Sequence, residues 1–155
     1  MARRNRPPYR IRVLHGVNCG AFGARQPELY GADSLAAINR RLIAAGRRRG
    51  CRVACRRTDD EATFVRAIHA AGRTADGLLC NPGAWTHTSV AVRDAVASVA
   101  IPVIEVHCSN IFAREPFRRN SFVAPLVRGM IAGFGPLGYA LGLEALIAML
   151  DCANG

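Results

Sequence analysis

At 155 residues the chain is long enough for one domain that buries ~70% of its unfolded surface without disulfide bonds. Half of its residues are apolar, and the formal net charge is +10 because 21 arginines stand against 11 acidic side chains. The absence of lysine excludes a Schiff base with a carbonyl substrate and the phosphate-binding lysine of a P-loop. The positive charge favours anionic partners.

The six cysteines follow neither a disulfide framework nor paired zinc spacing, so we expect reduced thiols. The basic N-terminal stretch leads into no apolar signal segment, and no uncharged apolar run reaches the ~18 residues of a membrane helix. These features together favour the cytoplasm. We expect residues 1–9 to be a solvated basic arm and residues 10–152 to form a single domain.

The first predicted strand is the apolar run 11–14. Residues 16–31 follow; they are rich in glycine and lack helical periodicity, which predicts a long loop. Two interpretations are open for this loop. It is either a lid that closes over a ligand with Arg25 and Tyr30, or an ordered Ω-loop in which Tyr30 packs on the core.

Helices and strands alternate along the middle of the chain. Ser34 is a predicted N-cap, and apolar residues recur behind it at helical spacing until Gly50. A strand is predicted at 51–56. The segment 58–61 has the S/T-x-x-E form of a capping box and precedes a second amphipathic helix.

The third predicted strand, 77–80, ends in a turn that begins at Asn81. Hydroxyl groups in residues 86–89 can cap a helix predicted at 90–98. With Asn81 and His87, the start of this helix is a candidate binding site for an anion or a sugar-like hydroxyl.

The last predicted strands are 101–106 and 129–134, and the helix 137–150 is apolar almost all round, as in a buried or interface-packed helix. The alternation of strands and helices predicts the α/β class with a parallel, doubly wound sheet. Five strands favour the flavodoxin-like order 2-1-3-4-5.

The stretch 101–119 is the strongest candidate for a functional site, because an apolar strand passes directly into charged and polar side chains. These are Glu105, His107, Ser109, Arg114 and Arg118. Ligands of open α/β sheets bind beyond the carboxyl ends of the strands. We interpret His107 as an acid/base residue and the arginines as holding an anion; from these residues alone, a buried structural histidine is an equal alternative.

Three segments of the chain together resemble type II 3-dehydroquinate dehydratases. They contain Gly-Val-Asn through Arg-Gln-Pro-Glu-Leu-Tyr-Gly in 16–31, Asn-Pro-Gly-Ala-Trp-Thr-His-Thr-Ser in 81–94, and Glu-Val-His-Cys-Ser-Asn-Ile-Phe-Ala-Arg in 102–118. The resemblance implies a flavodoxin-like, three-layer fold and a trimer-based dodecamer. It also implies a hydro-lyase that converts 3-dehydroquinate to 3-dehydroshikimate by anti elimination through an enolate, without metal or cofactor, in the shikimate or quinate pathway. The missing lysine agrees, because the type I enzymes require one.

The resemblance further implies roles for single residues. Tyr30 would be the base, as a phenolate that Arg25 and Arg114 stabilise, since a phenol is ordinarily protonated at neutral pH. Asn18 would hold a water molecule against the enolate oxygen.

His107 would protonate the leaving hydroxyl, and Glu105 would orient it. Asp94 would reach the site of a neighbouring subunit. The other residues that the resemblance assigns to substrate binding are Asn81, His87, Ser109, Ile111, Arg114 and Arg118, the last as a planar fork for a carboxylate.

Some positions depart from the pattern of this family. His15 and Val17 stand where asparagine and proline are usual, Cys19 begins a segment that is usually rich in leucine, and Phe112 replaces a common histidine. The departures leave open the behaviour of the lid and the exact substrate. A biosynthetic or catabolic role and the role of the N-terminal arm are also open.

Two alternative functions remain at this level. One is a lyase with the same fold and site that acts on a related cyclic hydroxy-ketone acid. The other is a basic nucleic-acid-binding module, against which stand an aromatic content of 6% and the absence of a nucleic-acid-binding motif.

Overall fold

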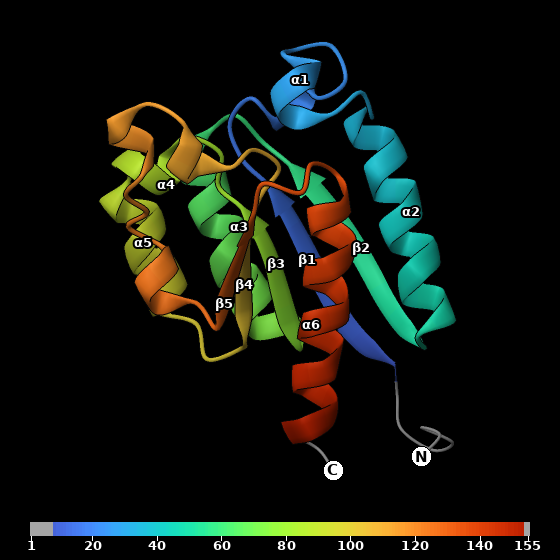
Figure 1. The fold of residues 1–155 in the computed structure, drawn as a ribbon. Helices are drawn as coiled ribbons and strands as arrows, with labels where there is room; N and C mark the ends of the chain where they lie inside the picture. The colour runs from blue at the N-terminus through green and yellow to red at the C-terminus, as the bar shows by residue number, and fades with distance from the viewer. Residues whose placement is uncertain (1–7, 154–155) are drawn as a thin grey trace.

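The computed structural model describes residues 8–153, in which one parallel sheet lies between two layers of helices (Figure 1). The strands are β1 (Tyr9–His15), β2 (Cys51–Arg57), β3 (Gly77–Asn81), β4 (Val103–His107) and β5 (Gly129–Ala132). Their order is β2-β1-β3-β4-β5, and every neighbouring pair is parallel. The predicted α/β class and flavodoxin-like strand order are therefore confirmed. The boundary expected at residue 10 falls inside β1, and residues 1–7 of the expected arm lie outside the described residues.

Helices α2 (Leu35–Arg48) and α6 (Leu137–Ala153) cover one face of the sheet, while α3 (Glu61–Thr74) and α5 (Val90–Ala97) cover the other (Figure 1). Two apolar clusters fill the spaces between these layers. Because both faces of the sheet are covered, every residue of β3 and β4 is buried. Glu105 is buried in the middle of β4, whereas Asn81 and His107 end the two strands at the edge where a pocket opens.

Side-chain caps set the helix starts. Ser34 accepts a hydrogen bond from Ala37 N at 3.2 Å, as predicted for α2. The predicted capping box before α3 is wrong. Asp60 is the N-cap and accepts from Thr63 N at 2.7 Å, whereas Thr58 Oγ1 accepts from Asp60 N at 3.0 Å. An aspartate immediately before the first turn reaches the free N–H groups of that turn better than a threonine two residues earlier.

Other element boundaries also differ from the prediction. The predicted loop 16–31 contains a 3₁₀ turn, η1 (Cys19–Ala21), and a single helical turn, α1 (Pro27–Tyr30). A further turn, α4 (Trp85–Thr88), precedes α5. Strand β5 ends at Ala132, because Gly133 has a left-handed φ of 94° that leaves the strand conformation.

The chain between β4 and β5 forms three short 3₁₀ turns: η2 (Ile111–Ala113), η3 (Pro116–Arg118) and η4 (Ala124–Leu126).

Helix α6 buries a row of residues against the sheet, as predicted, but Leu137 and Leu141 remain exposed. None of the helices within residues 8–153 combines the length and apolar character needed to cross a membrane. All six cysteines are free thiols.

Candidate active site

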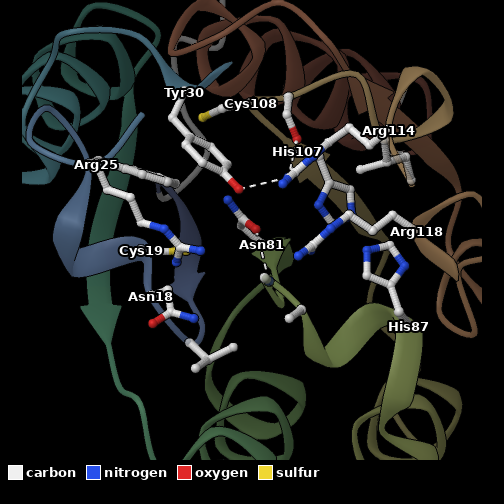
Figure 2. A pocket seen from close by; sticks show the side chains of 16 residues that line it. Asn18, Cys19, Arg25, Tyr30, Asn81, His87, His107, Cys108, Arg114 and Arg118 are labelled. Atoms are coloured by element: carbon white, nitrogen blue, oxygen red, sulfur yellow. Dashed lines mark hydrogen bonds between the residues drawn. The ribbon is translucent and has the colours of Figure 1, made fainter. Parts of the chain in front are cut away.

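A pocket opens at the carboxyl edge of the sheet (Figure 2). Residues from the segment after β1, the turn after β3 and the loop after β4 line it. The predicted site residues that line it are Asn18, Arg25, Tyr30, Asn81, His87, His107, Ser109, Ile111, Arg114 and Arg118. Glu105 lies behind His107, and Asp94 lies outside this pocket.

Close backbone contacts join the segment after β1 to the turn after β3. Gly16 N donates to Asn81 O at 2.7 Å. Gly83 adopts a φ of +63°, and a Cβ there would come within 2.4 Å of Val17 O, so only glycine fits. Asn18 takes a left-handed φ of 65°, which asparagine tolerates, and its N–H donates to Asp59 Oδ1 at 2.9 Å.

Tyr30, at the end of α1, presents its hydroxyl to the pocket. Arg114 Nη1 donates to this oxygen at 2.7 Å, and the guanidinium carbon lies 5.6 Å from the centre of the tyrosine ring (Figure 2). The ring itself stacks on Phe22 at a centroid distance of 5.6 Å. Tyr30 therefore packs on the core, as the Ω-loop interpretation expects, and it also lines the pocket, whereas closure of the loop over a ligand stays a prediction. Arg25 reaches the same pocket from the exposed side of the loop.

His107 and Glu105 form a buried pair at the end of β4. His107 Nε2 lies 2.6 Å from Glu105 Oε1, and the carboxyl side chain is 0% exposed. Burial alone would raise the pKa of Glu105, but its hydrogen bonds and the charge of His107 outweigh burial and hold that pKa below its ordinary value. An ionised Glu105 accepts the proton of Nε2. This leaves Nδ1 as the ring nitrogen available to a ligand.

Two hydroxyl groups that the sequence did not single out complete the environment of Glu105. Thr86 Oγ1 donates to Glu105 Oε1, and Ser121 Oγ lies 3.0 and 3.1 Å from the two carboxylate oxygens. Thr86 belongs to the hydroxyl-rich segment that was interpreted as helix caps. Ser121 follows no motif, and only the path of the chain after η3 brings it to β4.

The ring of His87 stacks on that of His107, with 6.3 Å between the ring centroids. Its Nδ1 is 2.8 Å from Asn120 O, so Nδ1 donates and Nε2 is left as an acceptor. Burial, with the charges of His107 and Arg118, lowers the pKa of His87 in spite of the bond to Asn120. The start of α5 does not line the pocket as expected, because α4 is inserted before it and Ser89 caps its first turn.

Three arginines give the pocket an excess of positive charge. The side chains of Arg114 and Arg118 are only 11% and 19% exposed, and both lie near the single carboxylate of Glu115, at 3.5 and 3.0 Å. Arg25 adds a third cation. The arrangement suits a small anionic ligand, and the fork of Arg118 suits a carboxylate.

Two cysteines, Cys19 and Cys108, also line the pocket. Burial raises the pKa of each thiol to about 12. Both are therefore neutral thiols at physiological pH, so neither is an activated nucleophile. The tyrosine and the two histidines that line the pocket are of residue types that ordinarily carry acid/base chemistry.

Asp94 is exposed on α5, where Arg93 Nη1 donates to its Oδ1 at 2.7 Å. It contributes nothing to the pocket of its own chain. The resemblance assigns it to the site of a neighbouring subunit, which stays a prediction.

These features define a class: a flavodoxin-like α/β protein whose pocket combines a tyrosine–arginine contact, a histidine–carboxylate pair and two further arginines. The sequence model of the family Dehydroquinase class II matches residues 9–147, and the chain belongs to this family. It is 52% identical over 141 residues to the 3-dehydroquinate dehydratase of Ruegeria pomeroyi, covering 91% of this chain and 95% of that protein. The 3-dehydroquinate dehydratase of a Nostoc species is 48% identical, with 92% and 97% covered.

Solved structures show the same relationship. The type II dehydroquinase from Propionibacterium acnes superposes with a TM-score of 0.88 at 41% sequence identity, covering 93% of this chain and 99% of that one. A 3-dehydroquinate dehydratase-like protein from Bifidobacterium longum has a TM-score of 0.68 at 30% identity, with 92% and 98% covered.

Proposed function

We propose that this protein is a 3-dehydroquinate dehydratase of the cytoplasm that converts 3-dehydroquinate to 3-dehydroshikimate and water, in the shikimate or quinate pathway. The observation that carries the proposal is the pairing in one pocket of Tyr30 with Arg114 and of His107 with Glu105. An elimination next to a ketone needs a base and an acid, and these two pairs supply them. The names of the relatives support the substrate.

In the first step Tyr30, as a phenolate, removes the proton next to the ketone, and the electron pair moves to the carbonyl oxygen to form an enolate. The Arg114 N–H that donates to the tyrosine oxygen stabilises the anionic base. Arg25 adds positive charge at the same wall. Asn18 holds a water molecule that donates to the enolate oxygen, where charge develops only during the reaction.

In the second step the enolate collapses, the ketone re-forms, and the carbon–oxygen bond of the leaving hydroxyl breaks as the new carbon–carbon double bond forms. His107 donates the proton that converts the hydroxyl to water. For this it carries a proton on Nδ1 in addition to that on Nε2, and the buried carboxylate of Glu105 offsets the positive charge.

The planar guanidinium of Arg118 donates two hydrogen bonds to the substrate carboxylate, and the remaining pocket residues bind the hydroxyl groups of the substrate. Asp94 completes the site from a neighbouring subunit in a trimer-based dodecamer. The residues that contact the substrate in this proposal are Asn81, His87, Ser109, Ile111, Arg114 and Arg118.

The test is a spectroscopic assay with 3-dehydroquinate. Formation of the conjugated enone raises the ultraviolet absorbance, and we expect this rise with the purified chain, unchanged after treatment with a chelator. If the ultraviolet absorbance does not rise at any pH between 6 and 9, the proposed function is rejected.

A further inference from the structure

A line of hydrogen bonds runs from the partly buried Asn39 on α2 to the turn after β3. Asn39 Oδ1 lies 2.8 Å from His15 Nε2, and His15 Nδ1 lies 2.9 Å from the Tyr139 hydroxyl. Asn81 Nδ2 lies 2.8 Å from the same hydroxyl. His15, Tyr139 and Asn81 are exposed by 0%, 1% and 3%. Of the four side chains, only Asn81 lines the pocket.

The hydrogens of this line can be placed from one unambiguous donor. The backbone N–H of Gly83 donates to Asn81 Oδ1 at 3.0 Å, so the amide turns its Nδ2 toward Tyr139. The Tyr139 oxygen accepts from Asn81, and its single hydrogen therefore goes to His15 Nδ1. A neutral His15 then carries its proton on Nε2 and donates to Asn39 Oδ1. Each group has one role that its neighbours impose.

The pKa shifts of His15 and Tyr139 agree with these donor and acceptor roles. Burial lowers the pKa of His15 to about 4, although the bond to Asn39 opposes this. Burial also raises the pKa of Tyr139 well above its ordinary value. At neutral pH the imidazole is thus neutral and the phenol protonated, the two states that the order of donors requires.

The line matters for the pocket because of what it leaves to Asn81. One N–H of its Nδ2 is used by Tyr139, and its oxygen is used by Gly83. The second N–H remains for an oxygen atom of a ligand. We propose that His15 and Tyr139 are positioning residues that hold Asn81 with this N–H toward the substrate; the inference rests on the proposed dehydratase function.

His15 fixes the direction of the hydrogen bonds in this line, because its Nδ1 accepts the hydrogen of the Tyr139 hydroxyl. Without an acceptor at His15 Nδ1, the Tyr139 hydroxyl is free to donate to Asn81, and the amide of Asn81 can then turn over. Glutamine at position 15 would keep both roles, because its amide donates through nitrogen and accepts through oxygen.

The experiment compares steady-state kinetics of variants with 3-dehydroquinate. Tyr139→Phe keeps the ring and removes the hydroxyl, and we expect KM to rise about tenfold with kcat within about twofold, because the Asn81 contact holds the substrate in the ground and transition states alike. His15→Leu should behave in the same way. His15→Gln should restore KM to within about threefold of the wild type. A merely destabilising change lowers the active fraction, and so the apparent kcat, but leaves KM unchanged.

Tyr9→Phe is the matched control. It also removes a tyrosine hydroxyl that bonds α6, since Tyr9 OH donates to Leu150 O at 2.9 Å, but it does so at the amino end of β1, away from the pocket. We expect a wild-type KM. In an Asn81→Ala background, whose own KM is raised, Tyr139→Phe should add no further increase, because the group it positions is gone.

Three outcomes overturn the inference: a wild-type KM for Tyr139→Phe, an equal rise for Tyr9→Phe, or a full further rise in the Asn81→Ala background. Failure of the wild-type chain to dehydrate 3-dehydroquinate instead rejects the proposed function. In that event crystal structures of Tyr139→Phe and His15→Leu decide the positioning separately. An unchanged Asn81 rotamer in both would overturn it, and an amide turned away from Gly83 would support it.

Discussion

The chemical roles proposed for Tyr30 and His107 depend on the side chains next to them. Tyr30 lies against the guanidinium of Arg114, and His107 lies against the carboxylate of Glu105. In the first contact Arg114 donates a hydrogen bond to the tyrosine oxygen, and in the second Glu105 takes up Nε2 of the histidine ring and leaves Nδ1 without that bond. The same two residues with apolar neighbours would be ordinary packing groups. Substitution at either position therefore tests the mechanism directly.

Removal of the Tyr30 hydroxyl removes the proposed base while keeping the stacking on Phe22. We expect Tyr30→Phe to lower kcat for 3-dehydroquinate by about 10³-fold or more. The unfolding midpoint and the oligomeric state should match those of the wild type. A kcat within tenfold of the wild type would show that another group takes the proton.

His107→Ala removes the proposed acid and leaves the buried Glu105 without its charge partner. We expect kcat to fall by about 10²-fold to 10⁴-fold. Steady-state turnover of 3-dehydroquinate measures the loss, and circular dichroism checks that the fold persists. Near-normal turnover would contradict the assignment of His107 as the acid.

Among the secondary-structure elements, the segment from α4 to α5 departs most clearly from the sequence prediction. The sequence predicts that the hydroxyls of residues 86–89 cap one helix, but in the structure they have different partners. Ser89 caps α5 by accepting from Val92 N at 2.9 Å, whereas Thr86 is buried against Glu105. Similar side chains in one short segment thus serve stability and the site, and periodicity alone does not distinguish them.

Ser89→Ala should isolate the structural part of this division. We expect a loss of about 1 kcal/mol in the free energy of unfolding, because the first turn of α5 loses its cap. Thr88→Ala, at the exposed neighbouring hydroxyl, is the control and should cost less than about 0.5 kcal/mol. Denaturant unfolding measures both. Equal losses for the two variants would contradict the assignment of the cap.

For the molecule as a whole, the buried polar line couples the stability of the fold to pH. The pKa of His15 falls from an ordinary value of 6.5 to about 4 on folding. The unfolded chain therefore takes up a proton below pH 6.5 that the folded chain resists until about pH 4. The contribution of His15 to the free energy of unfolding is therefore fully present above pH 6.5, declines as the pH falls to about 4, and changes little below that value.

We expect His15 to account for a decline of about 3 kcal/mol in the free energy of unfolding between pH 7 and pH 4. The wild type and His15→Gln should be compared by denaturant unfolding at the same protein concentration. Carboxylates such as Glu105 titrate in both, so they cancel in the difference. A parallel pH dependence of the two proteins would show that folding does not lower the pKa of His15.

The proposed assembly is tested by mixing two inactive variants. If Asp94 completes the site of a neighbouring subunit, co-expression of Asp94→Ala with Tyr30→Phe produces some sites with an intact tyrosine and an intact partner aspartate. Random pairing predicts roughly a quarter of wild-type activity in such hybrids. Activity no higher than that of the single variants would place Asp94 outside the site.

Much of the fold was predictable because it follows from local patterns. Apolar runs alternating with amphipathic stretches identified all five strands and the long helices, and the right-handed crossover rule left few sheet orders. Element ends were less accurate. The extent of β5 depended on the left-handed Gly133, and the start of α3 depended on which of two neighbouring side chains reached its free N–H groups.

The sequence by itself determined the fold class through the alternation of strands and helices, and it proposed the candidate site residues mainly through the resemblance of three segments to a known family. Only the tertiary structure decided which side chains support them. The partners of Tyr139 lie 124 and 58 residues away in the chain, and Ser121 meets Glu105 through an irregular loop. Such contacts depend on how the layers pack, and no local pattern encodes them.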